Sequence, residues 1–193
     1  MTYLDYVHSY LGIEVTQHPK SIFLSQKKYI GDLLNRFGMT ECNPLTTPME
    51  KNSKLTSIEG KEFEDATKYR QLVGSLNYLT TTRLDISFVV GILYRFMKKP
   101  CEGHWSAAKR LLKYLKGTQY FGLKYTHMGD FSLIGYYDSY FAGDQETRVS
   151  TLGYAMSLGS GVVSWRSCMQ SVPVDSTTKA EYVAAAKATK AIV

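Results

Sequence analysis

Two carboxylates stand where they could share a divalent cation. Asp138 follows the apolar, aromatic run that begins at Leu133, and a turn comes soon after it. Glu181 lies about forty residues later, early in a segment that opens with the helix-capping residue Ser176. Carboxylate oxygens are the ligands that Mg²⁺ prefers, and paired metal ions cleave phosphodiesters. The spacing therefore suggests part of a two-metal site, built from a strand end and the helix after it.

Each acid also has a plain structural interpretation. An aspartate at a strand end is usually a turn or cap residue, and a glutamate near a helix start can favour the helix dipole. Two carboxylates alone hold Mg²⁺ weakly, so we expect that a lone pair does not retain the ion. The residues by themselves leave both interpretations of Asp138 and Glu181 open.

Positive charge is concentrated in the first two-thirds of the chain. Residues 1–125 contain 18 Lys and Arg against 11 Asp and Glu, whereas residues 126–193 contain 5 against 6. Eight basic residues and one acid lie between Arg95 and Lys124. Such a stretch predicts contact with phosphates, although a solvated helix face is the alternative. The candidate nucleic-acid-binding residues are Lys98, Lys99, Lys109, Arg110, Lys113 and Lys116.

Several classes of protein are disfavoured. The three cysteines are far apart and form no Cys-x-x-Cys motif, so neither a zinc site nor a disulfide framework is indicated. No apolar run reaches the roughly 18 residues that a membrane-spanning helix needs, and the first residues do not resemble a secretory signal. We therefore expect an intracellular protein with free thiols and no membrane partner.

The first part of the chain alternates short strands with amphipathic helices. Residues 10–15 and 22–24 flank a turn at 18–21, which predicts a β-hairpin. Apolar residues at helical spacing predict helices over 26–37, 69–79, 86–97 and 104–116. Ser25 and Asp85 are the expected N-caps of the first and third of these helices, and Gly38 is the expected stop of the first. The stretch from 43 to 60 is rich in Pro, Thr and Ser, so we expect a linker or an extended wrapping loop.

The pattern changes near Thr126. Side chains alternate with a period of two at 122–125, 131–137, 153–158 and 162–165, with turns between them, and one helix follows from Ser176. The prediction is an α+β chain: a β-hairpin with a helical region, then a three-stranded antiparallel meander with one helix. We place the domain boundary between residues 125 and 126.

A set of motifs in a fixed order connects the chain with a family. The chain resembles the Pol polyprotein of copia-type LTR retrotransposons along nearly its whole length. The motifs that carry the resemblance are Tyr10-Leu-Gly-Ile-Glu-Val15, Phe23-Leu-Ser-Gln-Lys-Lys-Tyr29, Thr47-Pro-Met49, Tyr69-Arg-Gln-Leu-Val-Gly-Ser-Leu76, Thr82-Arg-Leu-Asp-Ile86, Leu112-Lys-Tyr-Leu-Lys-Gly-Thr118, Val163-Ser-Trp-Arg-Ser167 and Ser176-Thr-Thr-Lys-Ala-Glu-Tyr182.

The resemblance implies roles for both parts. Residues 1–125 would be the end of a reverse transcriptase, with the palm-closing hairpin and the thumb and connection helices. Residues 126–193 would be the start of a ribonuclease H-like domain that acts on the RNA strand of an RNA–DNA hybrid. Asp138 and Glu181 would then be two of the acids that hold Mg²⁺. The polymerase Tyr-x-Asp-Asp hairpin of the family precedes the first of these motifs, and the later nuclease acids follow the last.

Three functional hypotheses follow from the resemblance. The first is a fragment of a decayed element, catalytically inactive alone, without retained Mg²⁺; substitutions at motif positions, such as Tyr140, Leu84 and Lys179, favour it. The second is a module that binds RNA–DNA hybrid or RNA through residues 95–124. The third is a Mg²⁺-dependent ribonuclease H whose missing acids come from another chain. The oligomeric state stays open.

Overall fold

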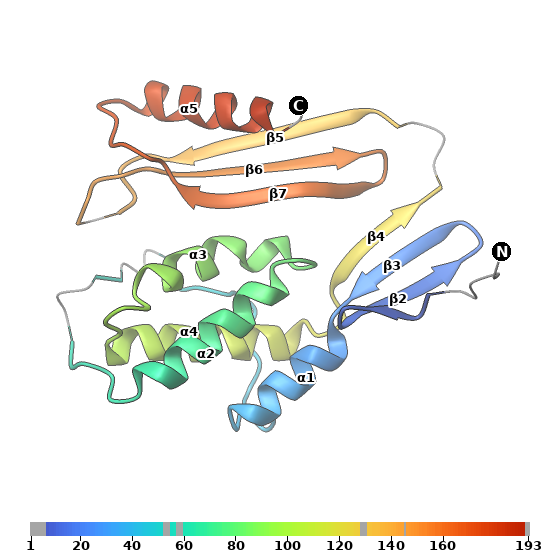
Figure 1. Cartoon of the computed structure of the whole chain (residues 1–193), viewed down its shortest axis with the longest axis horizontal. Coiled ribbons are helices and arrows are strands. Elements are labelled where there is room, and N and C mark those ends of the chain that lie inside the picture. The colour runs from blue at the N-terminus through green and yellow to red at the C-terminus, as the bar shows by residue number, and fades with distance from the viewer. Residues whose placement is uncertain (1–6, 52–54, 57–59, 128–130, 145, 192–193) are drawn as a thin grey trace. The chain divides into compact units, whose positions relative to one another are not determined.

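The computed structural model describes residues 7–51, 55–56, 60–127, 131–144 and 146–191. These residues form five α-helices, a four-stranded sheet and a three-stranded sheet, both antiparallel (Figure 1). The α+β prediction is confirmed at this level. The chain divides into two compact units, unit 1 (residues 1–53 and 60–127) and unit 2 (residues 54–59 and 128–193). Each unit is described by itself.

The sheet of unit 1 is built around the predicted hairpin. Strands β2 (Ile13–His18) and β3 (Ser21–Ser25) pair across the two-residue turn Pro19–Lys20. The short strand β1 (Ser9–Tyr10) pairs with β2 through a turn at Leu11 and Gly12, both of which have positive φ. The strand order is β1-β2-β3-β4.

Strand β4 (Gly122–Thr126) corrects one expectation. The change of pattern near Thr126 predicts alternating strands from residue 122 onward as a meander, but the first of them pairs antiparallel with β3, from Ser25↔Gly122 to Ser21↔Thr126. The pattern shows that a strand exists without showing which strand it pairs with. The outer edge of the first hairpin is therefore closed by a segment almost a hundred residues later, after all four helices of unit 1.

Helices α1 (Lys27–Arg36), α2 (Ala66–Leu79), α3 (Ser87–Arg95) and α4 (Glu102–Gly117) enclose the core of unit 1. Figure 1 shows α2, α3 and α4 packed as one helical group, with α1 beside them. The fully buried side chains at their contacts are mostly leucines at helical spacing, such as Leu72, Leu76 and Leu79 in α2 and Leu111, Leu112 and Leu115 in α4. Amphipathic periodicity thus predicted all four helices to within a turn or so.

Two predicted N-caps are wrong. Ser25 is the last residue of β3, and α1 begins after Gln26, whose buried side chain accepts a hydrogen bond from the Thr82 hydroxyl at 2.7 Å. Asp85 lies inside a single 3-10 turn, η1 (Leu84–Ile86), and bonds to side chains outside it. In both places a tertiary contact takes precedence over the local cap. The predicted stop at Gly38 is confirmed by its φ of +65°.

Unit 2 is the predicted meander followed by a helix. Strands β5 (Leu133–Tyr140), β6 (Thr151–Leu158) and β7 (Gly161–Met169) pair in that order, and α5 (Thr177–Lys190) packs against β5 and β6. Ser176 caps α5, as expected, by accepting the backbone N–H of Lys179 at 3.3 Å. Of the turn predicted between the segments 122–125 and 131–137, residues 128–130 lie outside the described residues. Within the described part of the chain, no helix is long and apolar enough to cross a membrane.

Candidate nucleic-acid interface

Helix α4 carries four of the six predicted basic residues. It begins at a reciprocal cap, because the backbone N–H of Cys101 donates to Nδ1 of His104 at 2.9 Å while the Cys101 side chain accepts a backbone N–H of the first turn. The His104 ring is fully buried and stacks on Phe96, with ring centroids 3.8 Å apart. The cap and the leucine stripe fix the helix, so its basic residues are presented on a rigid element.

Two of these four, Arg110 and Lys116, bind an earlier loop of the chain. Arg110 pairs with Glu50 at 2.9 Å and donates to the Thr47 hydroxyl at 3.0 Å. The Lys116 ammonium donates to the carbonyl of Thr40. The backbone N–H of Leu45 donates to the carbonyl of Lys113 at 3.2 Å. The loop of residues 40–50 is therefore bound along one side of α4, as the expected wrapping loop, and the phosphate-binding role of Arg110 and Lys116 stays a prediction.

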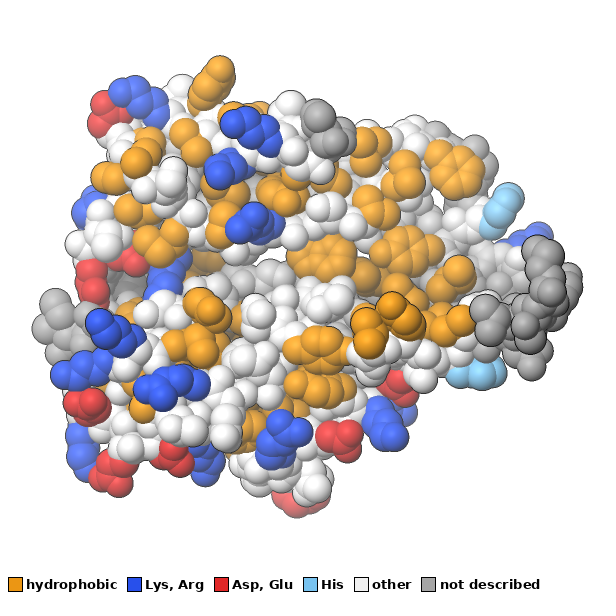
Figure 2. Space-filling view, in the orientation of Figure 1, with side chains coloured by type: hydrophobic (Ala, Val, Ile, Leu, Met, Phe, Trp, Pro, Cys, Tyr) orange, Lys and Arg blue, Asp and Glu red, His pale blue; other side chains and the backbone are white. Residues whose placement is uncertain are grey.

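The other predicted basic residues are more available. The Lys109 ammonium lies 5.8 Å from the centroid of the Trp105 ring, and Trp105 in turn stacks on Phe63 with centroids 4.8 Å apart. Lys99 makes a long, exposed ion pair with Glu62 at 3.6 Å, which water screens. Lys98 is exposed and Lys113 is half-buried. On the face shown in Figure 2, basic side chains stand among acidic ones and do not merge into one patch.

A buried ion pair lies at the opposite end of unit 1. The Arg83 guanidinium is only 2% exposed and donates hydrogen bonds to both carboxylate oxygens of Asp85, at 3.0 and 2.7 Å. It also donates to the carbonyl and the hydroxyl of Thr118, at 2.9 and 2.7 Å. The Tyr114 hydroxyl completes the cluster by donating to Asp85 at 2.7 Å. Residues 83–85 are thereby tied to the end of α4.

The cluster shifts two pKa values. Burial alone would raise the pKa of Asp85, but the hydrogen bonds from Arg83 and Tyr114, together with the charge of Arg83, outweigh it and leave that pKa below its usual value. Burial and the hydrogen bond to Asp85 raise the pKa of Tyr114. The carboxylate is therefore held ionised, and it neutralises Arg83.

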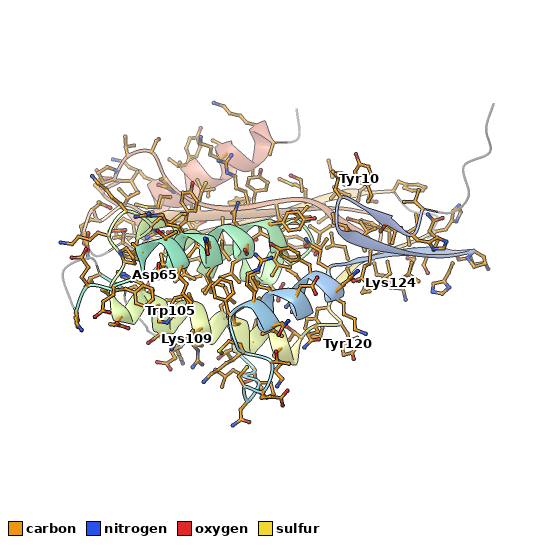
Figure 3. All side chains as sticks on the ribbon, turned by 60° about the horizontal axis from the view of Figure 1, so that its bottom comes forward. Tyr10, Asp65, Trp105, Lys109, Tyr120 and Lys124 are labelled. Carbon is orange, nitrogen blue, oxygen red and sulfur yellow. The ribbon has the colours of Figure 1, made fainter. Side chains whose placement is uncertain are left out.

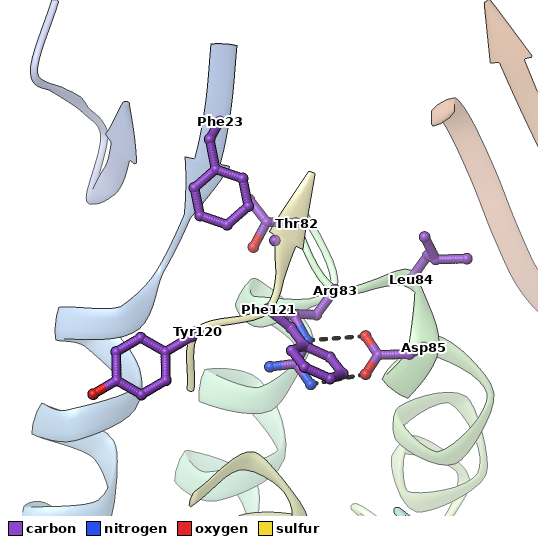
Figure 4. Close-up of a pocket in the computed structure, with 8 residues that line it drawn as sticks. Phe23, Thr82, Arg83, Leu84, Asp85, Tyr120 and Phe121 are labelled. Carbon is purple, nitrogen blue, oxygen red and sulfur yellow. Dashed lines mark hydrogen bonds and ion pairs between the residues drawn. The ribbon is translucent and has the colours of Figure 1, made fainter. Parts of the chain in front are cut away.

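A pocket of about 390 Å³ lies over this ion pair (Figure 4). Its walls are Phe23 of β3, the segment Tyr120-Phe121-Gly122 that leads into β4, and residues 82–85. A Cβ on Gly122 would lie 2.1 Å from the carbonyl oxygen of Leu24 and 2.9 Å from the Phe23 ring, so only glycine permits this close approach of β3 and β4. None of these residues was among the predicted site residues; the signal present in the sequence was the Thr82–Ile86 motif.

Asp138 and Glu181 lie in the same unit, on neighbouring elements. Asp138 is exposed in β5, and its Oδ1 accepts the backbone N–H of Ser139 at 2.8 Å. Gln170 links the Ser139 hydroxyl, at 3.5 Å, to the Ala180 carbonyl of α5, at 2.9 Å. Since adjacent side chains of a strand point to opposite faces, Ser139 points toward α5 and Asp138 points away from it.

This arrangement does not by itself make a magnesium site. Among the described residues, no group of three or more Asp, Glu, His or Cys side chains is placed to hold a metal ion. Glu181 is half-buried in the first turns of α5. The donor set therefore does not fit Mg²⁺ here, and the role of both acids as ligands stays a prediction.

Comparison with known proteins places the chain among mobile elements. The family model described as "Reverse transcriptase (RNA-dependent DNA polymerase)" matches residues 1–51. The retrovirus-related Pol polyprotein from transposon RE1 of Arabidopsis thaliana is 45% identical over 176 residues, which cover 91% of this chain and 12% of that polyprotein. The chain thus spans about an eighth of the length of that relative. No solved structure matches.

Two shorter relatives match over most of their own length. An uncharacterized mitochondrial protein of Arabidopsis thaliana is 38% identical over 180 residues, covering 93% of this chain and 75% of that protein. The secreted RxLR effector protein 161 of Plasmopara viticola is 46% identical over 123 residues, covering 63% of this chain and 87% of that protein. The long match to the transposon polyprotein and the reverse transcriptase model at the N-terminal end agree with each other. The chain therefore belongs to the copia-type retrotransposon Pol polyproteins, with reverse transcriptase sequence at its N-terminal end.

Proposed function

We propose that this chain is a nucleic-acid-binding segment of a reverse transcriptase and ribonuclease H, without catalytic activity by itself. The observation that carries the proposal is the 45% identity to a transposon Pol polyprotein over 91% of the chain. In this interpretation Tyr10–Val15, which spans the turn between β1 and β2, belongs to the palm-closing hairpin. Helices α1 to α4 are thumb and connection helices, and unit 2 is part of a ribonuclease H-like fold. The ligand is an RNA–DNA hybrid or RNA.

Lys98, Lys109 and Lys113 are the side chains we assign to the phosphates. Among the described residues, these three make neither an ion pair with an acid nor a side-chain hydrogen bond to the loop of residues 40–50, whereas Lys99 and Arg110 pair with acids and Lys116 donates to Thr40. Lys109 and Lys113 are one helical turn apart, and their like charges repel weakly unless an anion lies between them. Arg110 and Lys116 are assigned a supporting role, because they hold the loop of residues 40–50 on α4.

Salt dependence of hybrid binding tests the proposal. Each phosphate contact adds about −0.9 to the slope of log affinity against log salt. We expect a clearly negative slope for the full chain, and a slope shallower by about 2 to 3 when Lys98, Lys109 and Lys113 are replaced by Gln. A variant with Gln at Lys20, Lys187 and Lys190, three exposed lysines that do not belong to α4, is the matched control. A flat wild-type response would overturn the proposal.

The lack of activity is a separate part of the proposal. The described residues bring together no third acid with Asp138 and Glu181, and two-metal hydrolysis needs a fuller ligand set. We expect no cleavage of an RNA–DNA hybrid in Mg²⁺. Cleavage that disappears in Asp138→Asn would contradict this and favour a nuclease completed by a second chain. Cleavage that survives Asp138→Asn would come from a contaminant.

A further inference from the structure

We propose that the pocket over Arg83 and Asp85 binds one unpaired nucleobase, stacked on Phe121. The site is separate from the lysines of α4. Figure 3 places Trp105 and Lys109 along α4 and Tyr120 and Lys124 at the other end of the unit. The proposal extends the proposed function and rests on it only for the strand that supplies the base.

The size and lining of the pocket suit a planar ring. Its volume of about 390 Å³ is at the lower end of the range for small-ligand sites. Three aromatic side chains, Phe23, Tyr120 and Phe121, contribute to the wall, and Figure 4 shows their rings around one space. Every base has a π-face, so an exposed aromatic ring is a general platform for unpaired bases.

The Phe121 ring already contacts the guanidinium of Arg83. The Arg83 guanidinium lies 5.4 Å from the centroid of the Phe121 ring. The Phe121 side chain is nevertheless 55% exposed. Since Arg83 is held by Asp85 and Thr118, it fixes the ring from behind. A base stacking on the open side would therefore meet a rigid surface, which reduces the entropy lost on binding.

The Arg83–Asp85 ion pair forms a polar floor in the pocket, which favours a base over a purely apolar side chain. The Asp85 side chain is 33% exposed and lines the pocket, and a carboxylate oxygen can accept a further hydrogen bond from the amino group of a base. Its charge is balanced by Arg83, so the floor does not repel an anionic strand.

Cations stand at the rim where phosphates would pass. The Lys27 ammonium lies 4.4 Å from the centroid of the Tyr120 ring. Lys124 is the cross-strand partner of Phe23, so the two side chains stand next to each other on one face of the sheet, and Lys124 is exposed. Aromatic rings flanked by cations are the arrangement that single-strand-binding grooves use. This charge pattern is what favours a nucleotide over a neutral apolar peptide as the occupant.

The first measurement compares a single-stranded DNA with the same strand made abasic. We expect the wild-type chain to bind the strand with bases more tightly, and Phe121→Ala to reduce that preference by about 5- to 100-fold. Phe121→Leu keeps an apolar contact with Arg83 and should also lose most of the preference. The control, Tyr94→Leu, replaces an exposed aromatic residue of α3 outside the pocket and should change nothing.

The second measurement separates a free nucleotide from a strand as the source of the base. Adenosine monophosphate is titrated into the labelled chain, and the backbone amides of Thr82, Arg83 and Gly122 are followed by NMR. Shifts at these amides that vanish in Phe121→Leu support the pocket even if the salt test on α4 fails. An unchanged base preference in both Phe121 variants would overturn the inference. So would the absence of shifts at these amides together with no preference for bases.

Discussion

Unit 1 and unit 2 bury different kinds of side chain. In unit 1 the core consists of leucines and isoleucines at helix contacts, together with the Arg83 cluster, and many of these side chains are fully buried. In unit 2 the largest buried side chains among the described residues are Leu152 and Met156, and the helix that covers them contributes Ala180, Ala184 and Ala188. Alanines bring α5 close to the sheet but bury little apolar area, so each contact stabilises less.

Strand β5 of unit 2 is also largely exposed. Every residue of β5 except Ser139 is exposed, and the strand includes Ile134, Tyr136, Tyr137 and Tyr140. Exposed hydrophobic side chains, in orange, are visible on the face shown in Figure 2. Among the described residues β5 pairs with β6 alone, which leaves its other edge without a ladder partner. An apolar edge strand of this kind favours association with other chains. The comparison therefore predicts that unit 1 is stable and that unit 2 is weakly stable.

Hydrogen exchange should reveal the largest difference. We expect the β5 amides that pair with β6 to exchange on the order of a thousandfold faster than those in the middle of α2, because local opening costs less where fewer apolar atoms are buried. Exchange mass spectrometry on the full chain measures both. Equal protection of the two segments would contradict the comparison.

Truncation of a core leucine should cost more in unit 1 than in unit 2. Leu76→Ala in α2 is expected to lower the free energy of unfolding by about 3 to 4 kcal/mol, whereas Leu152→Ala in β6 should cost about 2 kcal/mol. The reason is that Leu76 is fully buried in a core rich in leucine, whereas the covering helix of unit 2 buries alanines. Urea denaturation with separate probes in the two units provides the measurement, and a larger cost for Leu152→Ala would reverse the ranking.

Loss of the buried ion pair should destabilise unit 1 in a pH-dependent way. Asp85→Ala leaves Arg83 buried without a counter-charge and is expected to cost about 3 kcal/mol at neutral pH. The pKa of Asp85 is lowered in the fold, so its contribution is complete above the unfolded-state pKa of about 4 and is lost as pH falls through the lower folded value. Asp85→Asn should therefore flatten the acid limb of a stability–pH curve for unit 1. An identical acid limb in the variant would show that other carboxylates dominate.

The smallest effect is expected on the exposed face of β5. Tyr136→Ser should change the free energy of unfolding by no more than about 0.5 kcal/mol, because the side chain is 65% exposed. The same change should reduce concentration-dependent association, as measured by light scattering. A large loss of stability would mean that Tyr136 is covered in solution.

Helical periodicity and the order of the family motifs are enough to predict much of the fold from the sequence. The leucine stripes of α2 and α4 fixed the buried faces, and Gly38 fixed the end of α1, because each is a local signal. The same kind of signal misplaced the caps at Ser25 and Asp85. A side chain that can cap a helix can also bond elsewhere, and the sequence does not show which partner is closer.

The candidate sites show the same difference between local signals and contacts of distant segments. Lys109 and Lys113 were found from charge alone, and the structure leaves them available. Arg110 and Lys116 have the same charge, yet they bind a loop that lies more than sixty residues earlier in the chain. The pocket residues Phe23, Arg83 and Phe121 are too far apart in sequence for any spacing rule to connect them.

The sequence by itself determined the family, the α+β class, the helical faces and the basic character of α4. These depend on residue type and short-range spacing, which the chain carries locally. Only the tertiary structure decided that β4 closes the first sheet, that Arg83 and Asp85 form a buried pair, and that Asp138 points away from α5. Each of these depends on which distant segments meet, and that is settled by packing and hydrogen bonding across the whole unit rather than by any one stretch.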